Sequence, residues 1–164
     1  MGILNNMEDT HMNKIAIRKA TLDGLDTIVK FNYNLAFETE NIKLNLETLT
    51  LGVENLILDN SKGQYHVYTV NNKIVGQIMY TYEWSDWRNG NILWIQSVYV
   101  HKEYRRQGIF NSLYNHLKDI CINTSNAVGL RLYVEKENLD AKATYESLGM
   151  YECKYNMYEY IVEK

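Results

Sequence analysis

The chain has 164 residues, a formal net charge of −3 at pH 7, and a composition that is 46% hydrophobic and 23% charged. This length is typical of one domain, and the balance is that of a globular protein and not of a disordered one. The weak acidic charge excludes a domain that holds nucleic acid mainly through phosphates, and no apolar run approaches the ~20 residues that cross a bilayer.

The N-terminal segment and the cysteines indicate the cellular compartment that we expect for the protein. Residues 1–12 have too short an apolar stretch for a secretory signal, so we expect a disordered leader or tag before a single domain at 13–164. Cys121 and Cys153 are too few for a disulfide framework or a thiolate metal cage. We expect small buried apolar side chains in a reducing, cytoplasmic protein, and no metal.

The first third of the chain predicts one strand and two helices. Charged and apolar residues alternate from Lys14 to Arg18, which indicates a short strand. Thr21 can cap a helix whose apolar positions follow the 3.6-residue period. These positions are Leu22, Leu25, Ile28 and Val29. A second helix is expected from Leu46 to Leu58.

The middle of the chain predicts three strands. Gln64–Val70 and Lys73–Trp84 are rich in Tyr, Val and Ile, and the pair Asn71-Asn72 between them tolerates the positive φ of a hairpin turn. A polar turn over Ser85–Asn91 leads to Ile92–Val100, whose few charges suit a strand buried on both faces.

The remainder predicts alternating helices and strands. We expect a helix over Gly108–Ile122, a strand over Val128–Val134, a helix over Asn138–Leu148 and a final strand over Tyr151–Ile161. The strand–helix–strand segment from Ile92 to Val134 should be a right-handed crossover with its two strands parallel. A ligand crevice is expected at the carboxyl ends of that parallel pair.

The junction before the Gly108 helix carries the sequence YRRQGIF, Tyr104 to Phe110. Free backbone N–H groups and the helix dipole favour an anion there, and Arg105 and Arg106 can add hydrogen bonds to phosphate oxygens. A solvated basic turn is the alternative interpretation. The segment is not a P-loop, because no Lys-Ser/Thr pair follows the glycine.

Two motifs resemble those of the GCN5-related N-acetyltransferase (GNAT) superfamily. Arg105–Ile109 match that family's [Gln/Arg]-x-x-Gly-x-[Gly/Ala] signature at the start of the helix after its fourth strand. Asn138, Ala141, Tyr145 and Gly149 match its Asn-x-x-Ala-x-x-x-Tyr-x-x-x-Gly spacing. The resemblance covers about residues 15–160. It implies an α/β fold with a mixed, mostly antiparallel sheet, one splayed parallel strand pair, and flanking helices.

The resemblance also implies a cofactor and residue roles. Acetyl-CoA would lie between the strands Ile92–Val100 and Val128–Val134, with Tyr145 as the general acid that protonates the departing thiolate. Phe110 departs from the family pattern, since a Gly or Ala usually stands there. The cofactor-binding residues implied are Val98, Tyr99, Val100, Arg105, Arg106, Gln107, Gly108, Ile109, Phe110, Asn111, Asn138, Ala141 and Tyr145.

The segment YEWSDWRNG, Tyr82 to Gly90, is the candidate acceptor site. Glu83 is the first candidate for the base that takes the amine proton, with a water relay as the alternative. Glu83, Trp84 and Trp87 would bind a cationic amine by ion pairing and cation–π attraction. The alternative is that the tryptophans pack the hairpin and that Asp86 is a turn residue.

These features lead to three hypotheses of function. The first is an enzyme that moves an acetyl group from acetyl-CoA to a primary amine, a small cationic one, by direct attack in a ternary complex. The second is a non-catalytic acyl-CoA-binding or sensing module. The third, a nucleotide-phosphate binder, is weakened by the missing Lys-Ser/Thr pair. The sequence predicts no nucleic-acid or membrane partner, and its final strand and aromatic hairpin leave a homodimer open.

Overall fold

The structure, a computed structural model, describes residues 13–162 of a chain that divides into two compact units, 1–132 and 133–164. The predicted leader, residues 1–12, lies outside the described residues. The single domain over residues 13–164 stays a prediction, and each unit is described by itself.

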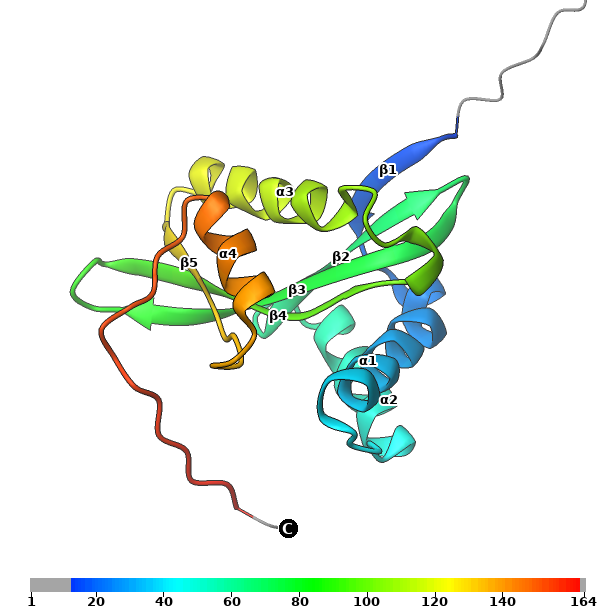
Figure 1. Cartoon of the computed structure of the whole chain (residues 1–164), viewed down its shortest axis with the longest axis horizontal. Coiled ribbons are helices and arrows are strands. Elements are labelled where there is room, and N and C mark those ends of the chain that lie inside the picture. The colour runs from blue at the N-terminus through cyan, green and yellow to red at the C-terminus, as the bar shows by residue number, and fades with distance from the viewer. Residues whose placement is uncertain (1–12, 163–164) are drawn as a thin grey trace, which may run out of the picture. The chain divides into compact units, whose positions relative to one another are not determined.

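The larger unit contains a five-stranded sheet in the order β1-β2-β3-β4-β5 (Figure 1). β1 to β4 are antiparallel to their neighbours, and β4 and β5 run parallel. This arrangement confirms the predicted mixed, mostly antiparallel sheet with one parallel pair. The strands span Ile15–Lys19, Gly63–Val70, Lys73–Ser85, Gly90–Val100 and Ala127–Leu132.

The β2–β3 hairpin turns where the sequence predicted it. Asn71 and Asn72 have φ angles of 49° and 64°, and both lie in the left-handed region. Asparagine tolerates this region better than most residues, which is why the pair suits a two-residue hairpin turn. Beyond the turn, the register of β2 with β3 shifts once, between Tyr68 and Thr69, and the strands stay paired as far as Gly63 and Thr81.

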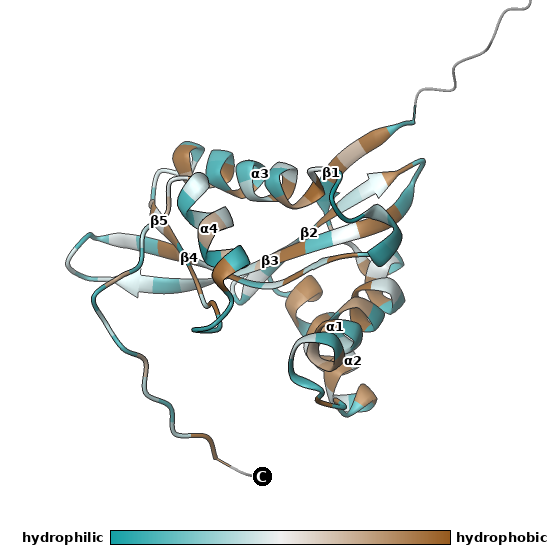
Figure 2. Ribbon diagram, viewed as in Figure 1, coloured by the Kyte–Doolittle hydropathy of each residue, from teal (hydrophilic) through white to brown (hydrophobic). Residues whose placement is uncertain are grey.

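Two helices lie on one face of the sheet and a third lies on the other. α1, Leu25–Glu40, and α2, Leu46–Leu58, pack on one face, and α3, Ile109–Asn123, covers the opposite face (Figure 1). α3 approaches β3 so closely that a Cβ atom added to Gly76 would lie 3.0 Å from Ile109. In Figure 2, brown and teal residues alternate along α1 and α2, as expected for helices with one face on a sheet.

The start of α1 differs from the prediction. Residues Leu22–Gly24 form a 3₁₀ turn, and the Thr21 hydroxyl hydrogen-bonds the Asp23 carboxylate instead of a backbone N–H of the helix. α2 has the expected bounds, and the Asn45 side chain caps it by accepting from the Thr48 N–H at 2.9 Å.

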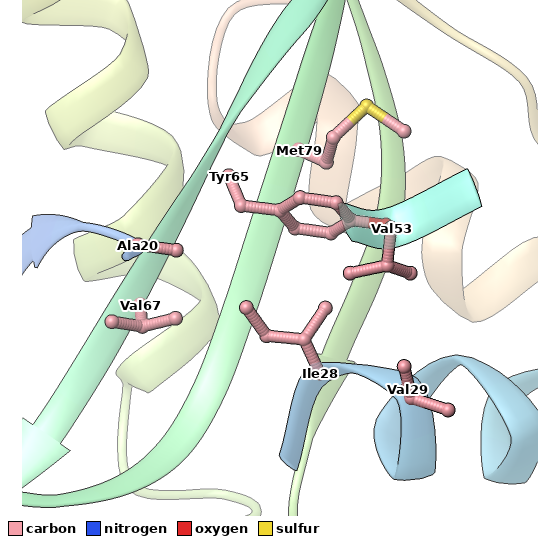
Figure 3. Close-up of a cluster of buried hydrophobic side chains, with 7 residues drawn as sticks. All are labelled: Ala20, Ile28, Val29, Val53, Tyr65, Val67 and Met79. Atoms are coloured by element: carbon pink, nitrogen blue, oxygen red, sulfur yellow. The ribbon is translucent and has the colours of Figure 1, made fainter. Parts of the chain in front are cut away.

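The hydrophobic core between the sheet and the helices α1 and α2 is a cluster of seven buried side chains (Figure 3). Ile28 and Val29 come from α1, Val53 from α2, and Tyr65 and Met79 from the strands. The period-3.6 pattern of the helices and the alternation of the strands thus bury their apolar faces against each other. This packing sets where the two helices lie on the sheet.

In the smaller unit, residues 133–162, α4 spans Leu139–Ser147. The predicted strand over Tyr151–Ile161 is wrong, because none of the described residues 151–162 lies in a strand and all are exposed. Alternating apolar residues suit a strand only where a neighbouring strand satisfies their N–H and C=O groups. Cys153 is exposed and Cys121 half-buried, so the expectation of two buried thiols is also wrong.

Among residues 13–162 no helix is long and apolar enough to cross a membrane. In the same range, no three His, Cys, Asp or Glu side chains come together in a group that could hold a metal ion.

Candidate functional site

The parallel strands β4 and β5 separate halfway along β4. Their pairing runs from Asn91 to Ile95, and within the described chain β4 continues to Val100 without a partner on that side. On its other side β4 pairs with β3, and the register shifts between Gln77 and Met79 so that β4 has one extra residue. Ser97 takes a φ of 49° at this β-bulge. The bulge and the separation of the strands coincide.

A buried polar network supports the bulge from the side of α1. The Gln77 amide nitrogen donates to Asn32 Oδ1 at 2.7 Å and to the Ser97 carbonyl at 3.2 Å. Asn32 Nδ2 donates to the Tyr65 hydroxyl at 2.7 Å, and Ser97 also hydrogen-bonds Tyr65. Burial raises the pKa of Tyr65, so its phenol stays protonated at neutral pH. These neutral groups fix the backbone of the bulge without placing a charge in the core.

A cavity of about 420 Å³ opens from this network between α1 and α2. Asn32, Tyr65 and Ser97 line its inner end, and Glu40, at the end of α1, lines it farther out. Asn32 and Glu40 are eight residues apart on one helix, which corresponds to about 12 Å at ~1.5 Å per residue. The cavity therefore connects the bulge of β4 to the exposed ends of the two helices.

The turn at which the sequence predicts a phosphate site has two residues in the left-handed region. Gly108 precedes α3 with a φ of 76°, and Arg106 also has a positive φ of 62°. No side chain caps α3, so the N–H groups of its first turn have no side-chain partner at the cap. These N–H groups and the helix dipole form a suitable seat for an anion.

The Arg105 side chain in this turn makes contacts within the protein. Arg105 donates to Glu38 of α1 at 2.6 Å and to the Val100 carbonyl at 2.9 Å, while Glu38 accepts from the Tyr99 hydroxyl at 2.8 Å. The Arg105 hydrogen bond lowers the pKa of Glu38, so the pair stays ionised. Arg105 thus ties the turn and the end of β4 to α1 instead of reaching toward a phosphate.

The other residues of this region that were predicted to bind the cofactor differ in burial and in contacts. The Gln107 side chain turns back to the Glu103 carbonyl at 3.3 Å, Ile109 is buried, and Asn111 is exposed. Phe110 is half-buried and its ring lies 6.3 Å from that of Tyr114. The Phe110 ring packs beside Tyr114, one turn farther along α3, as expected for a side chain that packs along the helix.

The second motif forms the two ends of α4. Asn138 Oδ1 accepts from the Ala141 N–H at 3.1 Å, which makes Asn138 the N-cap, and Gly149 follows the helix with a φ of 89°. Tyr145 is half-buried in this unit, and burial raises its pKa. The spacing of the motif is therefore that of a capped helix that presents one tyrosine.

The structure does not bring Glu83 to the bulge. Glu83 pairs with Ile92, five residues before Ser97 on β4, which places it about 16 Å away at ~3.3 Å per residue. Its carboxylate is bound by Arg131 of β5 at 2.5 Å. Trp84 and Trp87 are 58% and 85% exposed near the tip of the β3–β4 hairpin. These three residues share a hairpin but do not line the cavity beside the bulge.

The sequence analysis missed Asn32, Gln77, Ser97 and Glu38. Two of them carried a signal, since Asn32 interrupts the apolar face of α1 and Gln77 interrupts the apolar run IVGQIMY. A polar residue at a position that faces the core usually has a buried partner. Nothing in the sequence marked Ser97, because its positive φ depends on the pairing of β3 with β4.

The chain is similar in sequence and in fold to known acetyltransferases. Residues 29–150 match the family model described as "Acetyltransferase (GNAT) family". An N-alpha-acetyltransferase of Saccharolobus solfataricus is 29% identical over 154 residues, covering 84% of this chain and 81% of that protein. A crystal structure of a possible acetyltransferase from Clostridium difficile 630 is 69% identical, with a TM-score of 0.87, over 92% of this chain and 99% of that one.

At lower identity, the likeness shows the fold alone. A ribosomal-protein-alanine N-acetyltransferase from Brucella melitensis biovar Abortus 2308 is 17% identical and has a TM-score of 0.73 over 92% of this chain and all of its own. The family match extends over more than half of the chain and includes the bulge, the Gly108 turn and α4. The chain therefore belongs to the GNAT family and is an N-acetyltransferase.

Proposed function

We propose that the protein transfers an acetyl group from acetyl-CoA to a small, cationic primary amine by direct attack in a ternary complex. The observation that carries the proposal is the bulge at Ser97, where β4 loses its β5 partner and the α1–α2 cavity begins. Donor and acceptor would meet there from two sides, because the unpaired edge of β4 and the cavity adjoin the same residue.

The residues present suit the donor. The unpaired backbone of Val98–Val100 can hydrogen-bond the pantetheine arm as a strand would, and the uncapped N terminus of α3 after Gly108 can hold the pyrophosphate. Arg106, Asn111 and the first-turn N–H groups are the donors there. Arg105 contributes by fixing the turn through Glu38. Acetyl-CoA itself supplies the activated thioester.

The reaction needs an oxyanion donor and a proton donor. The amine nitrogen attacks the thioester carbon, and a backbone N–H at the bulge stabilises the negative charge that forms on the oxygen. The C–S bond then breaks, and the Tyr145 hydroxyl gives its proton to the departing thiolate. A raised pKa keeps Tyr145 protonated for this role.

The attacking nitrogen also has to lose a proton. The sheet register keeps Glu83 far from the bulge, and Arg131 binds its carboxylate, so a relay of solvent water through the cavity takes this proton in place of Glu83. The products are the acetylated amine and CoA with a free thiol.

Isothermal titration with acetyl-CoA, with ATP as the control ligand, tests the donor site, and release of the CoA thiol with a panel of amines tests transfer. We expect micromolar acetyl-CoA binding, no ATP binding, and amine-dependent thiol release. Binding of acetyl-CoA without transfer to any amine would instead favour a sensing module. An absence of acetyl-CoA binding would overturn the proposal.

A further inference from the structure

The walls of the α1–α2 cavity are aliphatic on the path from the bulge to the helix ends. Leu35 and Ala36 from α1, Leu49 and Leu56 from α2, and Met79 from β3 line it. The inner end has only neutral hydrogen-bonding groups, those of Asn32, Tyr65 and Ser97. A substrate that reacts at the bulge and extends outward would therefore contact hydrocarbon along most of its length.

The charged groups that line the cavity indicate which substrates it suits. Among the residues that line it, the charged side chain is Glu40, at the outer end, and no Lys or Arg accompanies it. A carboxylate or phosphate on the acceptor would find no cation there. A second ammonium group in the aliphatic section would lose its hydration without gaining a partner, which is costly.

We propose that the acceptor is a small primary amine with an uncharged, apolar tail, and that this tail lies between α1 and α2. The inference rests on the proposed function, because it assumes that the amine reacts at the bulge. It specifies the substrate class: alkyl or arylalkyl monoamines in preference to amino acids and to polyamines that carry an internal ammonium group. The volume of about 420 Å³ lies within the range of sites for small molecules.

Gly52 offers a direct way to test the occupancy of the cavity. It lies in α2, lines the cavity, and a Cβ added to it would meet no atom within 4 Å. The backbone at Gly52 thus has room for a Cβ atom, and a leucine placed there would take up part of the cavity volume. Glu47→Leu is the matched control, because Glu47 is exposed and lies about 140° around the same helix from Gly52 at 3.6 residues per turn.

The experiment measures kcat/KM for ethylamine, butylamine and hexylamine, with spermidine for comparison. The three alkylamines differ in tail length and hardly in basicity, so the series isolates the contact of the tail. In the unaltered protein we expect kcat/KM to rise up to about fourfold for each methylene that becomes buried, with spermidine below hexylamine. In Gly52→Leu we expect hexylamine to lose about tenfold or more while ethylamine changes less than about twofold.

The outcomes separate this inference from the function on which it rests. A flat alkylamine series, preference for spermidine, or an unchanged series in Gly52→Leu would each overturn the apolar-tail inference while transfer itself stands. No thiol release with any amine, together with no acetyl-CoA binding, would overturn the proposed function. The alkylamine series in the unaltered protein decides the matter even where Gly52→Leu lowers the yield of folded protein.

Discussion

Replacing Gln77 by leucine should lower the free energy of unfolding, although leucine suits the apolar residues around it on the sheet. Gln77 is fully buried, and its amide nitrogen donates to Asn32 Oδ1 and to the Ser97 carbonyl. Leucine has a similar size but no donor, so both acceptors lose this partner in the interior. Each unsatisfied buried acceptor costs about 1–3 kcal/mol.

Removal of the Gln77 side-chain oxygen offsets part of this loss of stability. Its side-chain oxygen is itself buried without a hydrogen-bond partner among the described residues, and leucine removes it. We therefore expect a net loss of about 2–3 kcal/mol in the free energy of unfolding. Because the Ser97 carbonyl belongs to the bulge, the same change should also lower kcat, by up to the ~10²-fold that a misplacement of about 1 Å can cause.

Urea unfolding measures the loss of stability, and steady-state thiol release measures kcat. Gln96→Leu is the control, because Gln96 is a half-buried amide that donates one bond, to the Thr81 hydroxyl at 2.9 Å. We expect the control to lose about 1 kcal/mol and to keep its kcat. Equal losses in the two variants would refute the argument that the Gln77 network supports the bulge.

Three further predictions concern charge and protons. Burial lowers the pKa of His66 to about 4, whereas a histidine in the unfolded chain has a pKa near 6.5. The unfolded chain therefore binds the proton more readily. The stability present at pH 7.5 should fall as the pH drops through 6.5 toward 4. His66, which hydrogen-bonds His116 at 2.9 Å, should account for about 2 kcal/mol of the loss at pH 5, and a His66→Gln variant with the same pH dependence would contradict this. Glu38→Gln should raise KM for acetyl-CoA about two- to fivefold with little change in kcat, because it removes the ion pair that fixes Arg105 and the phosphate turn. Steady-state kinetics with varied acetyl-CoA measure this KM, and an unaltered value would disprove the prediction. Tyr145→Phe should lower kcat about 10²-fold or more and leave the acetyl-CoA Kd unchanged by titration, whereas full activity would remove Tyr145 from the mechanism.

Local sequence signals determined most of the secondary structure. The helical period buried Ile28 and Val29, Asn71-Asn72 supplied the positive φ of the hairpin turn, and Gly108 supplied it before α3. Each of these features depends on residues close together in the chain, so a pattern in the sequence suffices to predict it. The same is true of the caps of α4, where Asn138 and Gly149 mark the two ends.

The site at the bulge, where we propose that the reaction takes place, depends on contacts between distant segments. Ser97 takes its positive φ at the point where the register of β3 with β4 shifts. Gln77 donates both to the Ser97 carbonyl and to Asn32, which is 45 residues away in the chain. Glu83 was selected because it lies near the end of a strand, yet the sheet register places it far from the bulge, and its carboxylate pairs with Arg131. Tyr151–Ile161 has the alternation of a strand, but a strand also needs a neighbouring strand, which sequence alternation does not supply. The sequence by itself thus determined the elements and the family motifs, whereas the tertiary structure decided which polar groups meet, because register and helix packing are set by contacts that no local pattern contains.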